Sequence, residues 1–362
     1  MIRIDLLTQD NENDWESFVG TYVDKEYAYS LKWRRLLKDV FAYDDLYYLI
    51  WNDHDLAGLL PVFMVKSKIL KDRLISIPFA DMGGFYFAPF VSDAVKLEAY
   101  HKVKERLGHD LGMAATAPFL FEVRGPHQSS NDFLIRDCHF LKTSPYVKFI
   151  IKLDVTWAAI EDGYHRSVRR ILQKPSDELV IDAGGEECLP GVYAIYVQEM
   201  KRLGSFPLPL TFFAGLFREL GRDGGFTVFT ASYAGKIIGA MTLIAFKDTI
   251  YADLIMSDVK FNYLFPKHYL YAESIKFAWQ SKQYKYYDFS RTRRVGGVFE
   301  HKRKWGGKVE DICYYYPTQR DRERCFLDPS QNEFALMGKL IKQCPASILK
   351  YAGGLLRRQA GK

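Results

Sequence analysis

The sequence predicts an α/β (α+β) protein of two related domains, each with a mixed, largely antiparallel central sheet flanked by helices. Three observations support this prediction. The chain has 362 residues, a length that suits about two ordinary domains. Segments with helical and with strand periodicity alternate along it. The same order of helices, antiparallel strands, helix and strand occurs twice, and a duplicated unit is the simplest explanation.

The first half opens with two predicted helices followed by two predicted strands. A helical pattern covers about 13–23, and a second one follows Ser30, whose hydroxyl suits a helix N-cap. Apolar runs at 46–51 and 56–65 predict two strands joined by a turn rich in Asn and Asp. A strand-like run, a long helix and a further strand then follow at about 73–87, 93–111 and 119–125.

The second half repeats this order, and its later helix begins at Pro266, a residue that suits the first turn of a helix. The expected turn between two of its strands lies at 234–236. Three predicted helices cover about 163–174, 192–204 and 210–221. Three predicted strands follow within about 226–246 and 248–258. A helix at about 266–281 and a strand at about 284–290 complete this half.

These patterns predict three parts of the chain. We expect an N-terminal domain at 1–160, a C-terminal domain at 161–330 and a basic amphipathic tail at 331–362. The boundary between the domains is expected near 150–165, and some elements are expected to cross it.

Composition excludes several classes of protein. Hydrophobic residues make up 48% and charged residues 26% of the chain, which excludes extended disorder. No apolar run approaches the roughly 20 residues that span a bilayer, and acids occupy the start where a signal peptide is basic. We therefore expect a cytoplasmic protein. The five cysteines form no CxxC pair and the eight histidines lack metal-binding spacing, so no metal is expected. Neither a G-x-S-x-G elbow nor a Walker A loop occurs.

The positive charge of the chain is concentrated in its tail. From Phe334 onward there are six basic residues and no acid, and without these six the 44 remaining basic residues equal the 44 acidic ones. Apolar residues recur there at helical spacing on two short segments separated by Pro345. Such helices either bind an anionic membrane surface peripherally or pack on the body of the protein, and the sequence leaves both open.

Four segments carry a resemblance to a known family. They are YYDFSRTRRVGGVFEHKRKWGG at 286–307, MKRLGSFPLPLTFFAGLFRELG at 200–221, LAGLLPVFMVKS at 56–67 and LISIPFADMGG at 74–84. In matching order, these segments resemble motifs of the Fem-type (FemAB-like) acyltransferases of the GNAT superfamily, which include members associated with exopolysaccharide and PEP-CTERM systems. The resemblance covers about 27–317.

This resemblance implies two GNAT-like domains and transfer of an acyl or aminoacyl group to an amine of a cell-envelope, peptidoglycan or exopolysaccharide precursor, either a small molecule or a lipid-linked glycan or peptide. It implies no tightly bound cofactor, and an acyl donor that acts as co-substrate, either an aminoacyl-tRNA or an acyl thioester. Two alternatives stay open. One is a thioester-dependent N-acyltransferase acting on a small amine or amino sugar, and the other is a non-catalytic binding member of an export system.

The sequence departs from the superfamily at two places. Enzymes that use coenzyme A hold its pyrophosphate at a glycine-rich turn before a helix, where backbone N–H groups face the anion. Here no glycine occurs between Phe261 and Ser281, and Pro266 removes one N–H donor. This favours a donor other than coenzyme A. His301 stands where the family usually has an aromatic residue.

The candidate catalytic residues are Lys302, Asp288 and Asp253. Lys302 matches the loop lysine of the family and would stabilise charge on the transferring carbonyl or bind a phosphate; the alternative is a solvated lysine. Asp288, at the end of a predicted central strand, would orient or deprotonate the acceptor amine, or hold Arg291 in place. Asp253, on the preceding strand, is a weaker candidate base.

The candidate substrate-binding residues are mainly basic. Arginine forks suit phosphates, and three arginines at i, i+3 and i+4 share one face of a helix, although a solvated helix face also explains them. The first domain would contribute a lysine and an aspartate, and an indole follows the catalytic lysine. The residues are Arg291, Arg293, Arg294, Arg166, Arg169, Arg170, Lys66, Asp81 and Trp305.

Overall fold

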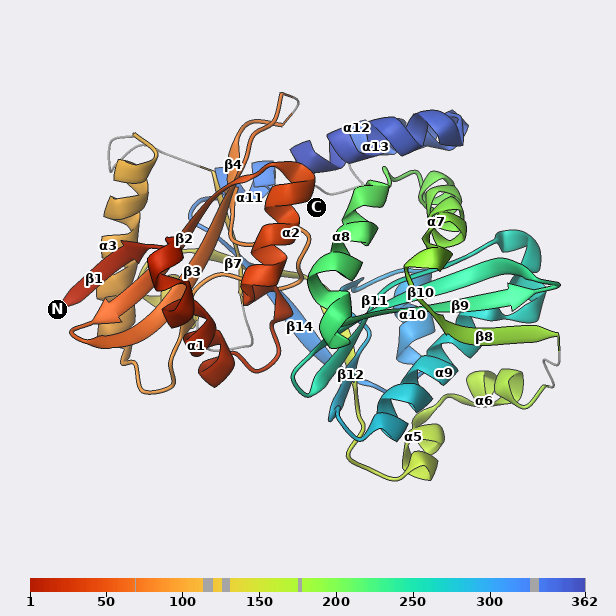
Figure 1. The fold of residues 1–362 in the computed structure, drawn as a ribbon. Helices are drawn as coiled ribbons and strands as arrows, with labels where there is room; N and C mark the ends of the chain where they lie inside the picture. The colour runs from red at the N-terminus through yellow and green to blue at the C-terminus, as the bar shows by residue number, and fades with distance from the viewer. Residues whose placement is uncertain (69, 113–119, 126–130, 175–177, 326–331, 362) are drawn as a thin grey trace. The chain divides into compact units, whose positions relative to one another are not determined.

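A computed structural model describes residues 1–68, 70–112, 120–125, 131–174, 178–325 and 332–361, with only the backbone at 332–335. Residue 119 of a predicted strand, and residues 331 and 362 of the predicted tail, lie outside the described residues. The chain divides into two units (Figure 1). One comprises Met1–Pro145, Ile312–Asp328 and Arg358–Lys362, and the other comprises Tyr146–Asp311 and Pro329–Arg357.

Two of the passages of the chain between the units lie inside strands. The chain leaves the first unit within strand β7 (Leu141–Lys152) and returns to it within strand β14 (Lys308–Tyr316). This division differs from the one expected from sequence, because 312–328 and 358–362 belong with the first unit and much of the expected tail belongs with the second.

The first unit is built on a sheet with strand order β1-β2-β3-β4-β6-β14, and β5 pairs with β3. Strands β4 and β6 are parallel and are connected through helix α3, whereas β1, β2 and β3 are antiparallel. The strands are β1 (Ile2–Leu6), β2 (Asp44–Asn52), β3 (Asp55–Val65), β4 (Arg73–Ile75), β5 (Tyr86–Phe87) and β6 (Phe121–Arg124). The helices are α1 (Glu12–Tyr22), α2 (Leu31–Phe41), α3 (Asp93–Asp110), α4 (Asp132–Arg136) and α11 (Gln319–Cys325), with short 3-10 helices η1 (Gln9–Asn11) and η2 (Tyr27–Tyr29).

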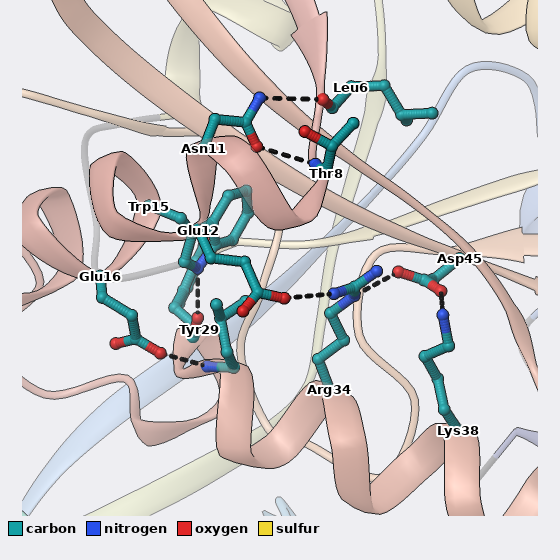
Figure 2. Close-up of polar contacts among 11 residues, drawn as sticks. Leu6, Thr8, Asn11, Glu12, Trp15, Glu16, Tyr29, Arg34, Lys38 and Asp45 are labelled. Carbon is teal, nitrogen blue, oxygen red and sulfur yellow. Dashed lines mark hydrogen bonds and ion pairs between the residues drawn. The ribbon is translucent and has the colours of Figure 1, made fainter.

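Polar contacts, some of them buried and others partly exposed, hold helices α1 and α2 and strand β2 together (Figure 2). The Nε of Arg34 lies 2.5 Å from a carboxylate oxygen of Asp45, and its Nη1 lies 3.4 Å from Glu12. The indole N–H of Trp15 donates to the carbonyl oxygen of Tyr29 at 2.7 Å. The apolar side of α2 packs inward, as its spacing of leucines predicts.

The second unit repeats the arrangement with strand order β7-β12-β11-β10-β9-β8, and β13 pairs with β7. Strands β11 and β12 are parallel and are connected through helix α9, while β8 to β11 form an antiparallel meander. The further strands are β8 (Leu179–Gly184), β9 (Phe226–Tyr233), β10 (Lys236–Phe246), β11 (Thr249–Ser257), β12 (Tyr286–Asp288) and β13 (Thr292–Arg293). The helices are α5 (Trp157–Gly163), α6 (Arg166–Leu172), α7 (Leu189–Leu203), α8 (Leu210–Leu220), α9 (Pro266–Ser281), α10 (Gly297–Arg303), α12 (Asn332–Gln343) and α13 (Ala346–Ala360), with 3-10 helices η3 (Glu186–Cys188), η4 (Gly221–Asp223) and η5 (Val259–Leu264).

The two faces of this second sheet are covered by different helices (Figure 1). Residues of α5, α6 and α9 pack with Tyr287 and Phe289 in one large aromatic core, and α7 and α8 cover the other face. Because side chains alternate along a strand, Asp288 points to the α7 face. The predicted hairpin turn is confirmed by the positive φ angles of Ala234 and Gly235, which suit a two-residue turn.

Helix α12 and most of helix α13 pack on the second unit through one side. Ile341 and Leu349 are buried, and Gly353 lies so close to Pro207 that a Cβ would fall 2.6 Å from its carbonyl oxygen. On the other side, large apolar side chains are exposed, including Tyr351 at 85%. Across the described parts of the chain, none of the helices combines the length and apolarity needed to cross a membrane.

Candidate functional site

Asp288 marks the point where two parallel strands separate. It is the last residue of β12 and faces Tyr251 in the last pair between β12 and β11. The chain then stays with β7, because Phe289 N–H donates to the carbonyl of Phe149 and β13 pairs with β7. Strand β11 continues to Ser257 without this partner. In α/β sheets, such openings at carboxyl ends of strands are where ligands bind.

The carboxylate of Asp288 is buried and paired. One oxygen lies 3.3 Å from the Nζ of Lys148, and both side chains are 2% exposed. The other oxygen accepts a hydrogen bond from the backbone N–H of Ser290 at 2.8 Å. A buried charge pair is tolerated only when further hydrogen bonds offset its desolvation, so this carboxylate is held in one orientation.

Sequence reasoning missed Lys148. The signal was present, because it is a lone lysine inside the apolar run VKFII of β7. Val147 and Phe149 on either side of it belong to the aromatic core, so alternation places Lys148 on the face of Asp288. A charged residue inside a buried strand requires a partner, and this requirement could have identified it.

Lys302 lies beside the peptide groups that follow Asp288. It belongs to helix α10 and is 6% exposed, so it is not the solvated lysine of the alternative interpretation. Its amine donates to the carbonyl oxygen of Phe289 at 2.5 Å and to that of Ser290 at 3.3 Å. The structure thus brings the two principal candidate residues to one strand end.

The backbone between these two residues is strained. Ser290 has a φ of 55°, in the left-handed region that costs an ordinary L-residue about 1 kcal/mol or more. Its N–H is held by Asp288 and its carbonyl by Lys302. Non-glycine residues persist in this conformation where their surroundings fix them, and they gather at functional sites.

Asp253 lies at a β-bulge in β11. The register between β10 and β11 shifts between Thr242 and Leu243, so Asp253 has no opposite residue. The hydroxyl of Thr242 accepts the N–H of Leu254 at 3.1 Å instead. Bulges near sites re-aim a side chain, and here the half-buried Asp253 is two residues beyond Tyr251, the partner of Asp288.

The turn before α9 offers few donors for a phosphate. It is the 3-10 helix η5, and Pro266 has no N–H at the start of α9. The N–H groups of His268 and Tyr269 both donate to the carbonyl of Phe265. A pyrophosphate cradle of free backbone N–H groups is therefore not formed by these residues.

A groove of about 990 Å³ lies beside this turn in the second unit. It is lined by α7, the β9–β10 turn, η5 and α12. Among its lining residues, basic side chains outnumber acidic ones: Lys201, Arg202, Lys236, Lys260 and Lys342 against Glu199 and Asp258. The lining includes neither Asp288 nor Lys302.

The arginines near the strand end differ in their surroundings. The guanidinium of Arg291 lies 5.0 Å from the ring centre of Tyr146. Arg293 is half-buried in β13, and the exposed Arg294 pairs with Asp311. The predicted hold of Asp288 on Arg291 stays a prediction, and the printed ion-pair partner of Asp288 is Lys148 at 3.3 Å.

The other predicted binding residues belong to other elements of the fold. Three arginines are exposed on α6, where Arg169 is 3.6 Å from Asp162: Arg166, Arg169 and Arg170. Lys66 and Asp81 belong to the first unit, and Lys66 is an exposed partner of Asp44 at 2.7 Å. Trp305 is 1% exposed in the aromatic core, so the structure corrects its predicted contact with substrate to a packing role.

Two histidines lie in this core beside Trp305. The rings of His268 and His301 are 4.8 Å apart, and burial lowers the pKa of each to about 4, aided for His268 by Lys304 and for His301 by His268 and nearby lysines. Both are therefore neutral at pH 7. Within the described residues, the Nε2 of His301 and the indole nitrogen of Trp305 are buried without a hydrogen-bond partner.

Comparison with known proteins identifies the fold. Residues 162–303 match the acetyltransferase (GNAT) domain family. The structure is similar to that of FemX, with a TM-score of 0.66 and 12% identity over 88% of this chain and 98% of that one. It is also similar to a tandem GNAT protein from the clavulanic acid biosynthesis pathway, with a TM-score of 0.51 and 9% identity over 88% and 99%. For L-PGS from Bacillus licheniformis the TM-score is 0.50, with 12% identity over 87% and 97%.

At these identities the structural likeness shows the fold, and the family match shows the type of domain. No curated protein matches the sequence. The predicted α/β architecture is confirmed, and the resemblance found in the four motifs agrees with both comparisons. The chain thus carries an acyltransferase domain of the GNAT superfamily at 162–303, and as a whole it has a fold similar to that of FemX.

Proposed function

We propose that this protein transfers an aminoacyl group to an amine of a cell-envelope precursor, of the peptidoglycan or exopolysaccharide type, and so forms an amide bond. The observation that carries the proposal is the buried Lys302 amine on the carbonyls that follow Asp288, where β11 and β12 separate. A buried ammonium is a costly feature that places fixed positive charge at a strand end.

The chemistry assigns a role to each candidate residue. The acceptor amine attacks the ester carbonyl of the donor, the C–N bond forms, and the C–O bond to the donor hydroxyl breaks. Lys302 stabilises the negative charge that develops on the carbonyl oxygen. Asp253, half-buried on its bulge, takes the amine proton, and that proton passes to the departing hydroxyl. Asp288, paired with Lys148, orients the acceptor.

The donor in this proposal is an aminoacyl-tRNA. The start of α9 offers few N–H groups that suit the pyrophosphate of coenzyme A, since Pro266 has none and those of His268 and Tyr269 donate to the carbonyl of Phe265. The groove beside it carries more basic than acidic side chains, which suits the phosphates of an RNA end. An RNA donor would also place the reaction in the cytoplasm.

The tail supports an acceptor that is attached to lipid. The exposed apolar side chains of α12 and α13 lie at helical spacing and are interspersed with lysines; they are Leu336, Leu340, Ile348, Tyr351 and Leu355. Amphipathic helices of this composition bind the interface of anionic membranes. We propose that these two helices hold the enzyme at the membrane surface where such a precursor resides.

The test of the donor is a transfer assay that offers two pools separately. Labelled aminoacyl-tRNA and labelled acetyl-coenzyme A are each incubated with the protein and a peptidoglycan precursor that carries a free amine. We expect label transfer only from the tRNA, and about 10²–10³-fold slower transfer for Lys302→Ala. Arg303→Ala, an exposed neighbour on the same helix, is the control and is expected to keep full activity. Transfer from acetyl-coenzyme A alone would contradict the proposal that the donor is an aminoacyl-tRNA. Transfer from neither pool would contradict the proposed reaction.

The membrane contact is tested by sedimentation with vesicles of phosphatidylglycerol and of phosphatidylcholine. We expect binding to the anionic vesicles only, weakened by the double change Ile348→Ser and Leu355→Ser. Val180→Ser, at an exposed apolar residue of β8, is the matched control. Substitution is preferable to deletion of the tail, because Arg73 and Arg124 donate to carbonyls at its end. Equal sedimentation of all variants would contradict this contact.

A further inference from the structure

The first unit contains a cavity of about 590 Å³ that is unrelated to the proposed transfer site. It lies where the parallel strands β4 and β6 begin and where helix α3 ends, since Leu74, Phe121 and Leu107 contribute to its wall. Ligands of α/β sheets usually bind at the opposite, carboxyl ends of the strands. The volume is in the range of small-molecule sites.

The wall of this cavity is polar on one side and apolar on the other. Helix α3, strand β6 and Phe140 contribute mainly apolar side chains, among them Tyr100 and Val103. The start of β4, the residues before it and helix α11 contribute most of the charged side chains. An amphiphilic ligand matches such a division, with its hydrocarbon part against α3 and its polar part against α11.

The charge of the polar side is positive. Five basic residues line the cavity, namely Lys71, Arg73, Lys104, Arg320 and Arg324, against two acids. Both acids already have partners in the protein. Asp72 accepts the N–H of Ser67 at 2.9 Å, and Asp321 accepts the hydroxyl of Thr318 at 2.6 Å. The basic side chains are thus in excess, so an anion is the complementary ligand.

Arg73 in the wall is buried and only partly satisfied. It is 1% exposed, and its Nη2 donates to the carbonyls of Gln359 at 2.7 Å and Ala360 at 3.0 Å. Within the described residues, its Nε and Nη1 have no hydrogen-bond partner. Burial also lowers the pKa of this guanidinium. Leaving buried charged donors unpaired is costly, and a carboxylate or phosphate oxygen is the acceptor that a guanidinium binds best.

We propose that this cavity is a second ligand site, which binds an anionic amphiphile with a single hydrocarbon chain and a carboxylate or phosphate head. The head contacts Arg73 and the basic side chains of α11, and the chain packs against α3 and β6. The site is independent of the acyl-transfer reaction, and its failure leaves that proposal untouched.

The experiment measures binding of three probes of equal chain length to the full chain by calorimetry below their micellar concentrations. Dodecanoate and dodecyl phosphate are expected to bind with one-to-one stoichiometry, and dodecanol at least about tenfold more weakly. Which of the two anions binds more tightly shows whether the site prefers a carboxylate head or a phosphate head. Each CH₂ added between octanoate and dodecanoate should tighten binding about fourfold, because its burial contributes about 0.8 kcal/mol.

Variants of α11 locate the site. The double change Arg320→Gln and Arg324→Gln should weaken dodecanoate binding about three- to tenfold, since both guanidinium groups are exposed at the cavity. Arg322→Gln removes the same charge from the same helix but does not line the cavity, and it should leave binding unchanged. Arg73→Gln should lower the affinity for dodecanoate at least about tenfold if the variant folds. If it does not fold, the double variant of α11 decides the test. Absence of saturable binding, equal binding of dodecanol, or equal effects of the double variant and Arg322→Gln would each overturn the proposal.

Discussion

The two units place a carboxylate at the same position of the same motif, and they treat it differently. In each unit two parallel strands are connected through a helix, as β4–α3–β6 and as β11–α9–β12. Glu122 faces Ile75 in the last pair of the first motif, and Asp288 faces Tyr251 in the last pair of the second. Both carboxylates are buried beside a basic side chain.

In the first unit this carboxylate is part of the scaffold. Arg124, two residues further along the same strand, donates to Glu122 at 2.9 Å and also to the carbonyls of Ile77 and Ala80. The hydroxyl of Tyr316 donates to Glu122 at 3.0 Å. In the second unit the residue two positions further along is the strained Ser290, which Lys302 contacts. The comparison teaches that one motif supports either a closed core or an open, strained strand end.

The largest effect is expected where the scaffold role is broken. Glu122→Gln removes the negative charge beside Arg124 and leaves a buried guanidinium without its counter-ion, which should lower the free energy of unfolding by about 3–5 kcal/mol. Urea denaturation measures this change. The fraction of Glu122→Gln that folds should keep the transfer rate of the unchanged protein. A lower rate in that folded fraction would contradict a purely structural role for Glu122.

Asp288→Asn tests the corresponding carboxylate of the second unit. It keeps the shape of the side chain but removes the charge that orients the acceptor, so we expect transfer to slow by about 10²-fold or more. Steady-state kinetics on folded protein measure this change. A variant with normal kinetics and only a lowered stability would make Asp288 a scaffold residue like Glu122.

The neutral histidines of the second unit predict a dependence of stability on pH. His268 and His301 have pKa values of about 4 in the folded chain against an ordinary 6.5. Above pH 6.5 both states are neutral and the contribution is constant. As the pH falls from 6.5 to 4 only the unfolded state takes up protons, so the free energy of unfolding should fall, by about 2 kcal/mol after allowance for partial exposure. His301→Phe should reduce this dependence on pH, measured as the difference between the free energies of unfolding at pH 7.5 and pH 5. An unchanged difference would contradict the prediction.

The smallest effect is expected at the strained residue itself. Ser290→Gly removes the strain of the left-handed conformation but adds freedom to the unfolded chain, so the unfolding free energy should rise by about 1 kcal/mol or less. Ser290→Ala keeps the strain and serves as control. If glycine destabilises the protein more than alanine does, the φ of Ser290 is not a source of strain.

Local sequence predicted the elements whose signals are local. Pro266 starts α9, the turn after Tyr233 joins β9 and β10, and the repeated order of elements gives the repeated motif. The predicted strand at 73–87 is wrong in extent, since only β4 and β5 at its two ends are strands. Pro78 and the positive φ of Phe79 interrupt it.

What could not be predicted depends on distant partners. Strands β1, β7, β8 and β14 were not expected, because their pairing partners and not their own patterns define them. For the same reason, nothing near 312–328 indicates that this segment joins the first unit. Asp288 and Lys302 were found through the motif, whereas Lys148 and Glu122 acquire their meaning only from the register. The catalytic roles stay predictions.

The passage of the chain between its units fixes the order in which they can mature during synthesis. Arg73 needs the carbonyl of Gln359, which lies 286 residues further along the chain. A ribosome that adds about 5–20 residues per second needs roughly 15–60 s to reach it. Until then, Arg73 of the first unit lacks the carbonyl group that its guanidinium contacts. The strands of the second unit that precede this point can already pair. We therefore expect the first unit to reach its final packing only after the end of the chain has been made.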